Sequence, residues 1–328
     1  MHAPAFWWRE AGFAAALLAP FAAVYGTVAG RRMRRAGESV GIPVVCIGSP
    51  TLGGAGKTPT ALTLGRLLAA ERPFFLTRGY GGTLAGPVVV DPARHDARQV
   101  GDEPLLLARV APTVVARDRV AGAQAARAAG AGVVIMDDGF HSASLVKHLA
   151  LLATDAAHGI GNGRVFPAGP LRAPLATQIA QAHAVLVIGA GAAAAPVMAA
   201  AHGLAVFHGR LAPEPGALSE LAGRRVLAFA GIGHPDKFFA TLEAAAIAAV
   251  IRRSYADHHR YTQAEAASLL AEAERNDLIL LTTAKDLARM TGDAAVASLA
   301  QRARTLPVSL VLDDEKGFRG FVVERLGL

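Results

Sequence analysis

The sequence contains 328 residues, of which 52% are hydrophobic, and its formal net charge is +7 at pH 7. This length suffices for one large domain or two ordinary ones. The single cysteine, Cys46, excludes an internal disulfide framework and any Cys-based zinc site. The positive charge is typical of proteins that meet nucleic acid, an anionic membrane surface or a phosphorylated substrate. A composition biased toward Arg and Ala explains the overall charge equally well, so charge alone selects no partner.

An uncharged segment near the N-terminus predicts membrane association. Residues 11–30 carry no charge across 20 positions, which is about 30 Å of helix and matches the hydrocarbon thickness of a bilayer. Arginines follow at once at positions 31, 32, 34 and 35, and the positive-inside rule keeps them and the rest of the chain in the cytoplasm. Trp7 and Trp8 suit an interfacial belt at the other end. Pro20 and the Ala-rich composition leave three arrangements open: a spanning helix, an interfacial helix, or an ordinary docked helix.

A phosphate-binding loop is the clearest motif. The apolar run 42–47 precedes a glycine-rich loop that ends in Lys57 and Thr58, and a helix-like segment follows from Pro59 to Ala70. Glycines let backbone N–H groups close around phosphate oxygens, the lysine reaches the β- and γ-phosphates, and the threonine hydroxyl can hold Mg²⁺. The usual pattern has Gly where this chain has Thr51, and the alternative is a glycine-rich turn without a ligand. The predicted nucleotide-binding residues are Thr51, Leu52, Gly53, Gly54, Ala55, Gly56, Lys57 and Thr58.

After this loop, short apolar runs alternate with helical stretches. Runs of strand character lie at 74–77, 88–90, 113–116, 133–136, 149–153 and 185–188, and this rhythm predicts a parallel sheet with helices on both faces. A second set follows the Pro- and Gly-rich stretch 212–216, at 226–230, 250–255, 278–281 and 308–312. We therefore predict an α/β fold: a P-loop NTPase-like parallel sheet flanked by helices, with a smaller second α/β domain. The expected segments are a membrane-associating helix in 1–30, a P-loop domain in 31–212 and the smaller domain in 213–328.

Three acidic positions stand where this fold places functional groups. Asp137 and Asp138 end the apolar run 133–136, and a carboxylate at such a strand end can hold Mg²⁺ beside a P-loop. Asp102 begins a helix-like segment. In each case the alternative is a helix cap, because Asp at a helix N-terminus accepts backbone hydrogen bonds.

A histidine pair and several arginines complete the candidates. Asp257, His258 and His259 follow a strand-like run; adjacent histidines rarely converge on one metal. A carboxylate beside a histidine can orient the imidazole, which titrates near neutral pH, so we predict an acid–base or positioning role. Loop arginines near the predicted strand ends are candidates for binding phosphate groups, and each alone is more often a solvated surface residue. They are Arg78, Arg117, Arg119, Arg164 and Arg172.

Together, these segments resemble one family, the tetraacyldisaccharide 4'-kinases of lipid A biosynthesis. The matching pieces run in family order from about residue 42 to residue 286, and the family also has an N-terminal hydrophobic helix. The combination is far more specific than any single motif. The pieces are 53–59 (GGAGKTP), 77–81 (TRGYG), 101–106 (GDEPLL), 115–119 (VARDR), 137–140 (DDGF), 161–163 (GNG), 167–172 (PAGPLR), 230–233 (AGIG), 257–259 (DHH) with 261–262 (YT), and 282–283 (TT) with 285–286 (KD).

The resemblance implies transfer of the γ-phosphoryl group of ATP, with Mg²⁺, to the 4'-hydroxyl of tetraacyldisaccharide 1-phosphate, an acylated glucosamine disaccharide, giving lipid IVA. It places the enzyme on the cytoplasmic face of the bacterial inner membrane, held there by its N-terminal helix, with no nucleic-acid partner; the sequence does not set the oligomeric state. It also implies a role for each of several residues. Thr58 and Asp138, with Asp137, hold the metal. Lys57 approaches the phosphates, and Arg172 approaches either the phosphates or the acceptor. Asp102 accepts the hydroxyl proton with the assistance of His258, and Asp257 orients His258.

Three positions depart from the family pattern. Its usual Gln-His after Asp-Asp-Gly-Phe is His141-Ser142 here, and its usual Glu between Thr-Thr and Lys-Asp is Ala284.

The main rival function is a membrane-tethered P-loop switch or ATPase that couples hydrolysis to a partner protein. Against it, the lysine that such ATPases place before the Gly pair is Leu52, and no N-K-x-D guanine reader is present.

Overall fold

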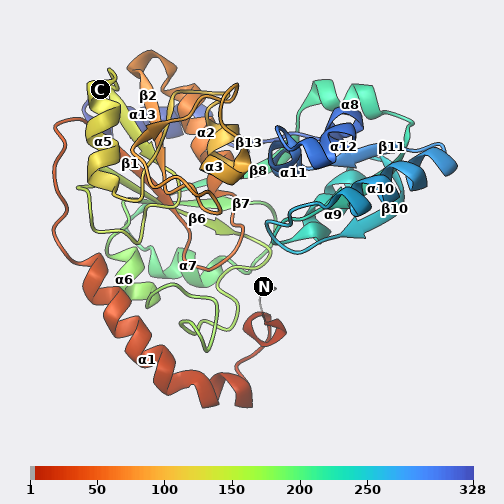
Figure 1. The fold of residues 1–328 in the computed structure, drawn as a ribbon. Helices are drawn as coiled ribbons and strands as arrows, with labels where there is room; N and C mark the ends of the chain where they lie inside the picture. The colour runs from red at the N-terminus through yellow and green to blue at the C-terminus, as the bar shows by residue number, and fades with distance from the viewer. Residues whose placement is uncertain (1–3) are drawn as a thin grey trace.

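Two sheets organise the chain, and the computed structural model describes residues 4–328 (Figure 1). The first is a nine-stranded sheet in the order β13-β8-β7-β6-β1-β5-β2-β4-β3, and the second is a four-stranded sheet in the order β10-β9-β11-β12. In Figure 1 they form two bodies side by side, the second coloured from green-blue to blue. The predicted α/β fold class, with a smaller second α/β domain, is confirmed.

The large sheet is parallel throughout its interior, and its two edge strands, β3 and β13, are antiparallel to their neighbours. Its central strand is fully buried, with Val45 and Ile47 on one face and Val44 and Cys46 on the other. Such strands read as continuous apolar runs because helices cover both faces. The strands are β1 (Val44–Gly48), β2 (Pro73–Thr77), β3 (Val88–Val89), β4 (Thr113–Val115), β5 (Val133–Met136), β6 (Leu149–Asp155), β7 (Ala184–Ile188), β8 (Ala205–Pro213) and β13 (Val308–Leu312).

Helices cover the two faces of this sheet in separate groups. Leu64 of α2 and Phe318 of α13 pack on the face of Val45, whereas Ala126 of α5 and Val197 of α7 pack on the face of Val44. The helices of this part are α2 (Lys57–Leu67), α3 (Ala97–Val100), α4 (Asp102–Leu107), α5 (Arg119–Ala128), α6 (Leu175–Ile179), α7 (Ala195–Ala200) and α13 (Glu315–Leu326), with the 3₁₀ turn η2 (Ala69–Glu71).

The strand order reverses at β1, which fixes where a ligand binds. β1 pairs with β5 on one side and with β6 on the other. Beyond β5 the sheet continues with β2, β4 and β3, and beyond β6 it continues with β7, β8 and β13. In open α/β sheets, ligands bind beyond the carboxyl ends of the strands at such a switch point. The loop from β1 to α2 lies there.

The second sheet is parallel and carries helices of its own. Phe229 of β9 packs with Leu269 of α10, and Ala228 of β9 packs with Phe239 of α9, so each face has its own apolar cluster. The elements are α8 (Pro215–Leu221), β9 (Arg225–Ala230), α9 (Pro235–Ala244), β10 (Ala248–Ser254), α10 (Gln263–Arg275), β11 (Ile279–Thr282), α11 (Ala284–Met290), η3 (Ala294–Val296), α12 (Ala297–Arg302) and β12 (Arg304–Thr305).

The C-terminal segment differs from the expected domain division. Residues 308–326, assigned by sequence to the second domain, return to the large sheet as β13 and α13. Leu310 and Leu312 lie in the same buried cluster as Leu64 of α2. The second domain is therefore an insertion between β8 and β13, held to the first by two chain crossings.

The N-terminal apolar helix, α1 (Phe13–Met33), lies along the first domain as an arm (Figure 1). Among the described residues, it is the one helix long and apolar enough to cross a membrane. Its most apolar 18-residue stretch has a mean hydropathy of 1.7, and 22% of that stretch is buried. It follows the 3₁₀ turn η1 (Ala5–Trp8). Trp7 is 6% exposed and donates its indole N–H to the Pro167 carbonyl. The expectation that Trp7 and Trp8 form an interfacial belt is wrong for Trp7, because its ring is buried against the protein.

Candidate active site

The loop between β1 and α2 has the geometry of a phosphate cradle. Gly53 and Gly56 have φ values of 117° and 81°, a region that L side chains rarely adopt. A side chain at Gly56 would also stand 2.7 Å from Ile188. Lys57 is the first residue of α2 and its Nζ donates to the Gly53 carbonyl at 3.3 Å, curling over the loop. Thr58, 6% exposed, follows in the first turn of α2, where the backbone N–H groups favour an anion.

Thr51 replaces a glycine without strain. It forms an isolated antiparallel bridge with Leu171, so its backbone is extended and any residue fits. Its carbonyl accepts from Arg172 Nε at 3.1 Å, and Leu52 N–H donates to the Pro170 carbonyl at 2.8 Å. Two hydrogen bonds therefore hold the segment that carries Arg172 against the start of the loop.

Asp137 and Asp138 follow β5 and differ in their partners. Asp138 accepts from Arg172 Nη2 at 3.2 Å and lies 3.9 Å from Lys57 Nζ. Burial opposes its charge, but Lys57 and Arg172 outweigh burial and lower the pKa of Asp138. Asp137 is 3% exposed and neither of its carboxylate oxygens has a hydrogen-bond partner. Burial, with the charges of Glu103 and Asp138, raises the pKa of Asp137 to about 7.

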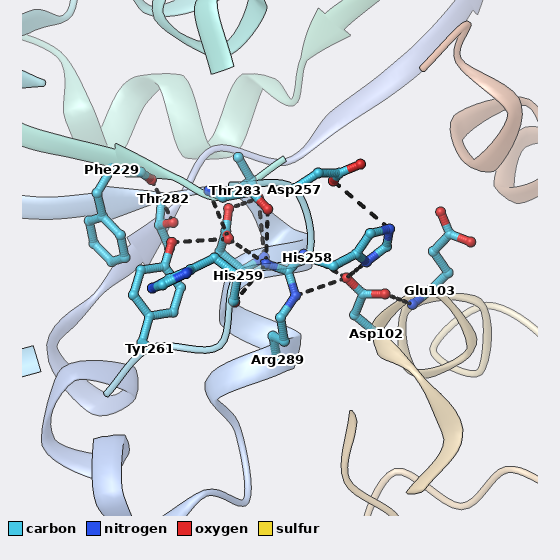
Figure 2. Close-up of polar contacts among 12 residues, drawn as sticks. Asp102, Glu103, Phe229, Asp257, His258, His259, Tyr261, Thr282, Thr283 and Arg289 are labelled. Atoms are coloured by element: carbon cyan, nitrogen blue, oxygen red, sulfur yellow. Dashed lines mark hydrogen bonds and ion pairs between the residues drawn. The ribbon is translucent and has the colours of Figure 1, made fainter. Parts of the chain in front are cut away.

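Asp102 meets His258 across the two domains (Figure 2). Asp102 begins α4 and is 3% exposed, and its Oδ2 lies 3.3 Å from His258 Nδ1. Arg289 of α11 donates to the same oxygen from Nε at 3.0 Å and from Nη2 at 2.6 Å. Oδ1 accepts the Glu103 N–H at 3.0 Å. Asp102 and His258, to which the family resemblance assigns a joint role, are therefore in contact in this structure.

A second ion pair joins the same two helices. Lys285 of α11 lies 2.5 Å from a carboxylate oxygen of Glu103 of α4. Burial acts against the Lys285 charge, but Glu103 and Asp102 raise its pKa above the usual range. Two cations of α11 thus face two carboxylates at the start of α4.

A buried scaffold holds Arg289 in place. Its Nη1 donates to the carbonyls of Gly231 and His259, and to Asp286 at 2.9 Å. Asp286 also accepts from the Tyr261 hydroxyl at 3.1 Å and from the Gly231 N–H at 3.0 Å. Figure 2 shows Tyr261 and Arg289 converging on this point from different segments of the second domain. Arg289 therefore links Asp102 to the second domain by direct hydrogen bonds.

His258 lies between two carboxylates at unequal distances. Asp257 Oδ1 is 3.8 Å from Nε2, longer than a hydrogen bond, whereas Asp102 contacts Nδ1. Asp102, rather than the predicted Asp257, is therefore the residue placed to orient the ring. The Asp102 contact raises the pKa of His258, partly offset by burial. Burial in turn opposes ionisation of Asp102, but His258 and Arg289 outweigh it and hold the pKa of Asp102 well below its usual range.

These shifts predict how stability depends on pH. The raised pKa of His258 means that its contribution is complete below about pH 6.5 and is lost as pH rises through the folded-state pKa. The lowered pKa of Asp102 means that its contribution is complete above about pH 3.9 and is lost only in strong acid. We expect His258→Gln to destabilise the protein most between about pH 4 and 6.5, and less at pH 9, measured by urea unfolding. His202→Gln, at an exposed position, is the control, and an equal loss at every pH would contradict the pairing.

Sequence reasoning did not identify Arg289 or the Lys285–Glu103 pair. Both link α4 to α11 over more than 180 positions, which local patterns do not reveal. The available signal was the helical spacing of Asp286 and Arg289, three positions apart and directly after the 282–286 motif.

Comparisons with known proteins identify the family. A family model described as tetraacyldisaccharide-1-P 4'-kinase matches residues 14–327. The chain belongs to this family. A tetraacyldisaccharide 4'-kinase of Rhodopseudomonas palustris (strain BisA53) is 52% identical over 331 residues, covering 100% of this chain and 96% of the relative. One from Methylobacterium sp. (strain 4-46) is 55% identical over 312 residues, covering 94% of each.

A solved structure has the same fold. It is a crystal structure of LpxK from Aquifex aeolicus, described as an "apo" form in complex with ATP, with a TM-score of 0.74 at 23% identity. The match covers 95% of this chain and 99% of that one. The predicted family is thus confirmed over almost the whole chain.

The departures from the tetraacyldisaccharide 4'-kinase pattern have structural partners. His141 Nε2 donates to the Oε1 of fully buried Gln178 at 2.8 Å, and Gln178 Nε2 donates to the carbonyls of Pro50 and Ala173. Burial lowers the pKa of His141 to about 4, so the ring is neutral. Ala284 packs against the cluster around Val100. Through Gln178, His141 thus supports the backbone just before Thr51 and just after Arg172.

Proposed function

We propose that this protein is an ATP-dependent kinase that phosphorylates the 4'-hydroxyl of tetraacyldisaccharide 1-phosphate in lipid A biosynthesis. The observation that carries the proposal is the convergence of the phosphate cradle at Lys57 with the Asp102–His258 pair, in a chain of this family. Helix α4, which Asp102 begins, packs against α2, which Lys57 begins, so the acceptor pair lies near the cradle. A phosphoryl donor and a hydroxyl acceptor therefore share one space beyond β1, β5 and β2.

Mg²⁺ fits the residues on the β5 side of the cradle. Both oxygens of Asp137 are buried without a partner, and the raised pKa of this carboxyl is what a nearby divalent cation would reverse. Thr58 would supply a hydroxyl and Asp138 a second carboxylate. Within residues 4–328, no group of three His, Cys, Asp or Glu side chains is arranged to hold a metal ion, and P-loop Mg²⁺ takes most of its ligands from phosphates and water. When bound, the ion neutralises charge on the phosphates.

The chain's own residues position the donor. Lys57 lies against the loop with its ammonium free to reach the phosphates, and Arg172 is anchored to the Thr51 carbonyl beside Asp138. Phosphoryl transfer has a loose transition state, so positioning and charge stabilisation dominate its catalysis. Burial lowers the pKa of Lys57, and the negative charge of Asp138 acts against this shift. We assign Lys57 and Arg172 to the phosphates that become more negative during transfer.

Asp102 and His258 form the acceptor side. The strongly lowered pKa of Asp102 makes it a weak proton acceptor. In a loose transition state the hydroxyl proton leaves late, so we assign Asp102 chiefly to orienting the hydroxyl. His258, with 31% of its side chain exposed, is placed to share the proton. Asp257 contributes negative charge at 3.8 Å rather than a hydrogen bond.

We assign α1 to the membrane surface on the cytoplasmic side, lying in the interface rather than crossing it. Its small residues pack on the protein: Gly26 lies against Pro174 and Val165. The opposite side exposes an apolar stripe at helical spacing, with Phe13, Leu17, Phe21, Val24 and Val28 exposed by 84%, 66%, 67%, 68% and 44%. An interfacial helix buries one such face, and the arginines at 31–35 favour anionic headgroups.

Polar substitutions in this stripe test that assignment. We expect Phe13→Ser, Leu17→Ser and Phe21→Ser together to lower binding to anionic vesicles by roughly 100-fold or more, because each buried side chain of this size contributes about 1.5–3 kcal/mol. Flotation with vesicles measures it. Val250→Ser, which removes a 49% exposed apolar side chain of the second domain, should change nothing. A triple variant that floats like the wild type would place the anchor elsewhere.

Acceptor dependence separates this function from a P-loop ATPase or switch. We expect ADP formation by the purified protein only when detergent-dispersed tetraacyldisaccharide 1-phosphate is present. The two cross-domain ion pairs support this, because they hold a hydroxyl-binding carboxylate at the cradle, which a hydrolytic switch does not need. Steady ATP hydrolysis without the lipid, unchanged when the lipid is added, would favour the switch.

A further inference from the structure

The two carboxylate oxygens of Asp102 have unequal numbers of hydrogen-bond donors (Figure 2). Oδ2 accepts two hydrogen bonds from Arg289 and lies 3.3 Å from His258 Nδ1. Among the residues that the structure describes, Oδ1 accepts only the Glu103 N–H, at 3.0 Å. A carboxylate has about two lone-pair sites on each oxygen. Oδ2 is therefore fully occupied, whereas Oδ1 keeps one site for a further donor, such as a sugar hydroxyl.

Arg289 determines which oxygen stays open. Its Nε and Nη2 both donate to Oδ2, at 3.0 and 2.6 Å. A guanidinium is planar and donates in fixed directions, so this fork sets the rotation of the Asp102 carboxylate. The two side chains are 6% and 3% exposed, and water has little access to replace the contact. A lysine at this position would supply the charge without the fixed directions.

Asp286 holds the other end of the guanidinium. It is fully buried, and its Oδ1 accepts from Arg289 Nη1 at 2.9 Å. Tyr261 and the Gly231 N–H donate to the same oxygen, and the Thr283 hydroxyl donates to Oδ2 at 2.6 Å. A side chain at Gly231 would begin 3.1 Å from Asp286 Oδ1, so the glycine leaves room for this carboxylate. Arg289 is thus clamped on the side away from Asp102.

The charges around Asp102 depend on Arg289 as well. The ionisable groups that face Asp102 are His258, Arg289 and Lys285 from the second domain and Glu103 from α4. Burial opposes ionisation of Asp102, but His258, Arg289 and Lys285 outweigh it and lower its pKa. The Asp102 contact raises the pKa of His258, and Arg289 acts against that rise. Removing the Arg289 charge should therefore raise the pKa of both members of the pair.

We propose that Arg289 is a positioning residue for phosphoryl transfer: by occupying Oδ2 of Asp102, it directs Oδ1 toward the acceptor hydroxyl. Asp286 acts one step further away, by fixing Arg289. This assignment rests on the proposed kinase function. Arg289 acts through Asp102 and contacts neither substrate, so its loss should lower kcat and leave the KM for ATP nearly unchanged.

Arg289→Lys separates direction from charge. The variant keeps the cation but loses the fork, so we expect kcat to fall by roughly 10- to 100-fold, the size of loss that a small misplacement of a reacting group produces. The KM for ATP and the pH at which activity falls in acid should stay as in the wild type. Arg275→Lys, at an exposed position of α10, is the matched control and should leave kcat unchanged.

Arg289→Met removes the charge as well. We expect a similar or larger loss of kcat, and the acid limb of the kcat profile should move to higher pH by roughly 1–3 pH units, the effect of one adjacent cation on an aspartate. Because this change leaves two buried carboxylates without their cation, Asp286→Asn combined with Arg289→Met is measured too. Its reference is Asp286→Asn alone, which keeps Arg289 on Asp102. Thermal unfolding checks that each variant is folded.

Two results would overturn the positioning role. One is a folded Arg289→Lys enzyme with nearly wild-type kcat, which decides the case even where the Met variants unfold. The other is a loss of kcat in the folded Met variants without any movement of the acid limb. Both results presuppose acceptor-dependent transfer by the wild type, whose absence would instead overturn the kinase function.

Discussion

Lys57→Ala is expected to reduce phosphoryl transfer by at least roughly 10²–10³-fold, the loss typical for one preorganised charge-stabilising group. The ammonium makes one hydrogen bond, to the Gly53 carbonyl, and a 3.9 Å contact with Asp138. Asp138 keeps Arg172 as its partner in the variant, so this carboxylate is not left without a cation and the fold should persist. The measurement is kcat at saturating ATP and lipid, with thermal unfolding as the check on folding.

A matched lysine makes the result specific. Lys316→Ala removes an exposed lysine from α13 and should leave kcat unchanged. Near-normal turnover of a folded Lys57→Ala enzyme would remove the phosphate-loop assignment, because no other lysine stands at the start of α2.

Asp102→Asn and His258→Ala are each expected to lower kcat by roughly 10²–10⁴-fold, the usual range for acid–base and proton-positioning groups, with little change in the KM for ATP. Asn is preferred to Ala at position 102. Truncation to Ala would leave Arg289, whose side chain is 6% exposed, without its carboxylate, and breaking a buried pair costs about 3–5 kcal/mol. Asn keeps the shape and still accepts a hydrogen bond.

The double variant decides whether the two residues act together. Groups that function as a unit give a double loss far smaller than the product of the single losses. We expect that outcome for Asp102→Asn with His258→Ala, because both act at one carboxylate oxygen, Oδ2. Fully multiplicative losses would mean independent roles, and an active Asp102→Asn enzyme would reduce Asp102 to the first residue of a helix.

The sequence predicted the central strands and the two edge strands, but it missed β8 and assigned residues 308–312 to the second domain rather than to the large sheet. β1 and β5 are buried on both faces, so their apolar runs are continuous and easily recognised. β8 is half-buried with several exposed residues, and its Pro213 end was read as a linker. The return of β13 to β8 depends on antiparallel pairing between segments about 100 positions apart, which a local pattern does not contain.

The candidate site divides in the same way. The cradle at 51–58 and the carboxylates after β5 are contiguous motifs, so their positions were predictable from spacing. Arg289 was not, because its partner Asp102 lies 187 positions away and an arginine on an amphipathic helix usually faces solvent. Trp8 was read through its neighbours in sequence as a membrane anchor, whereas its neighbours in space are His158 and His234.

The most direct test of the central claim follows the phosphoryl group itself. Purified enzyme is incubated with Mg²⁺, γ-labelled ATP and tetraacyldisaccharide 1-phosphate, and the position of the label is found by phosphorus–proton correlation spectroscopy of the extracted lipid. The account predicts label on the 4' oxygen, none on an analogue that lacks the 4'-hydroxyl, and little free phosphate when lipid is absent. Label released as inorganic phosphate at the same rate with and without the lipid would contradict it.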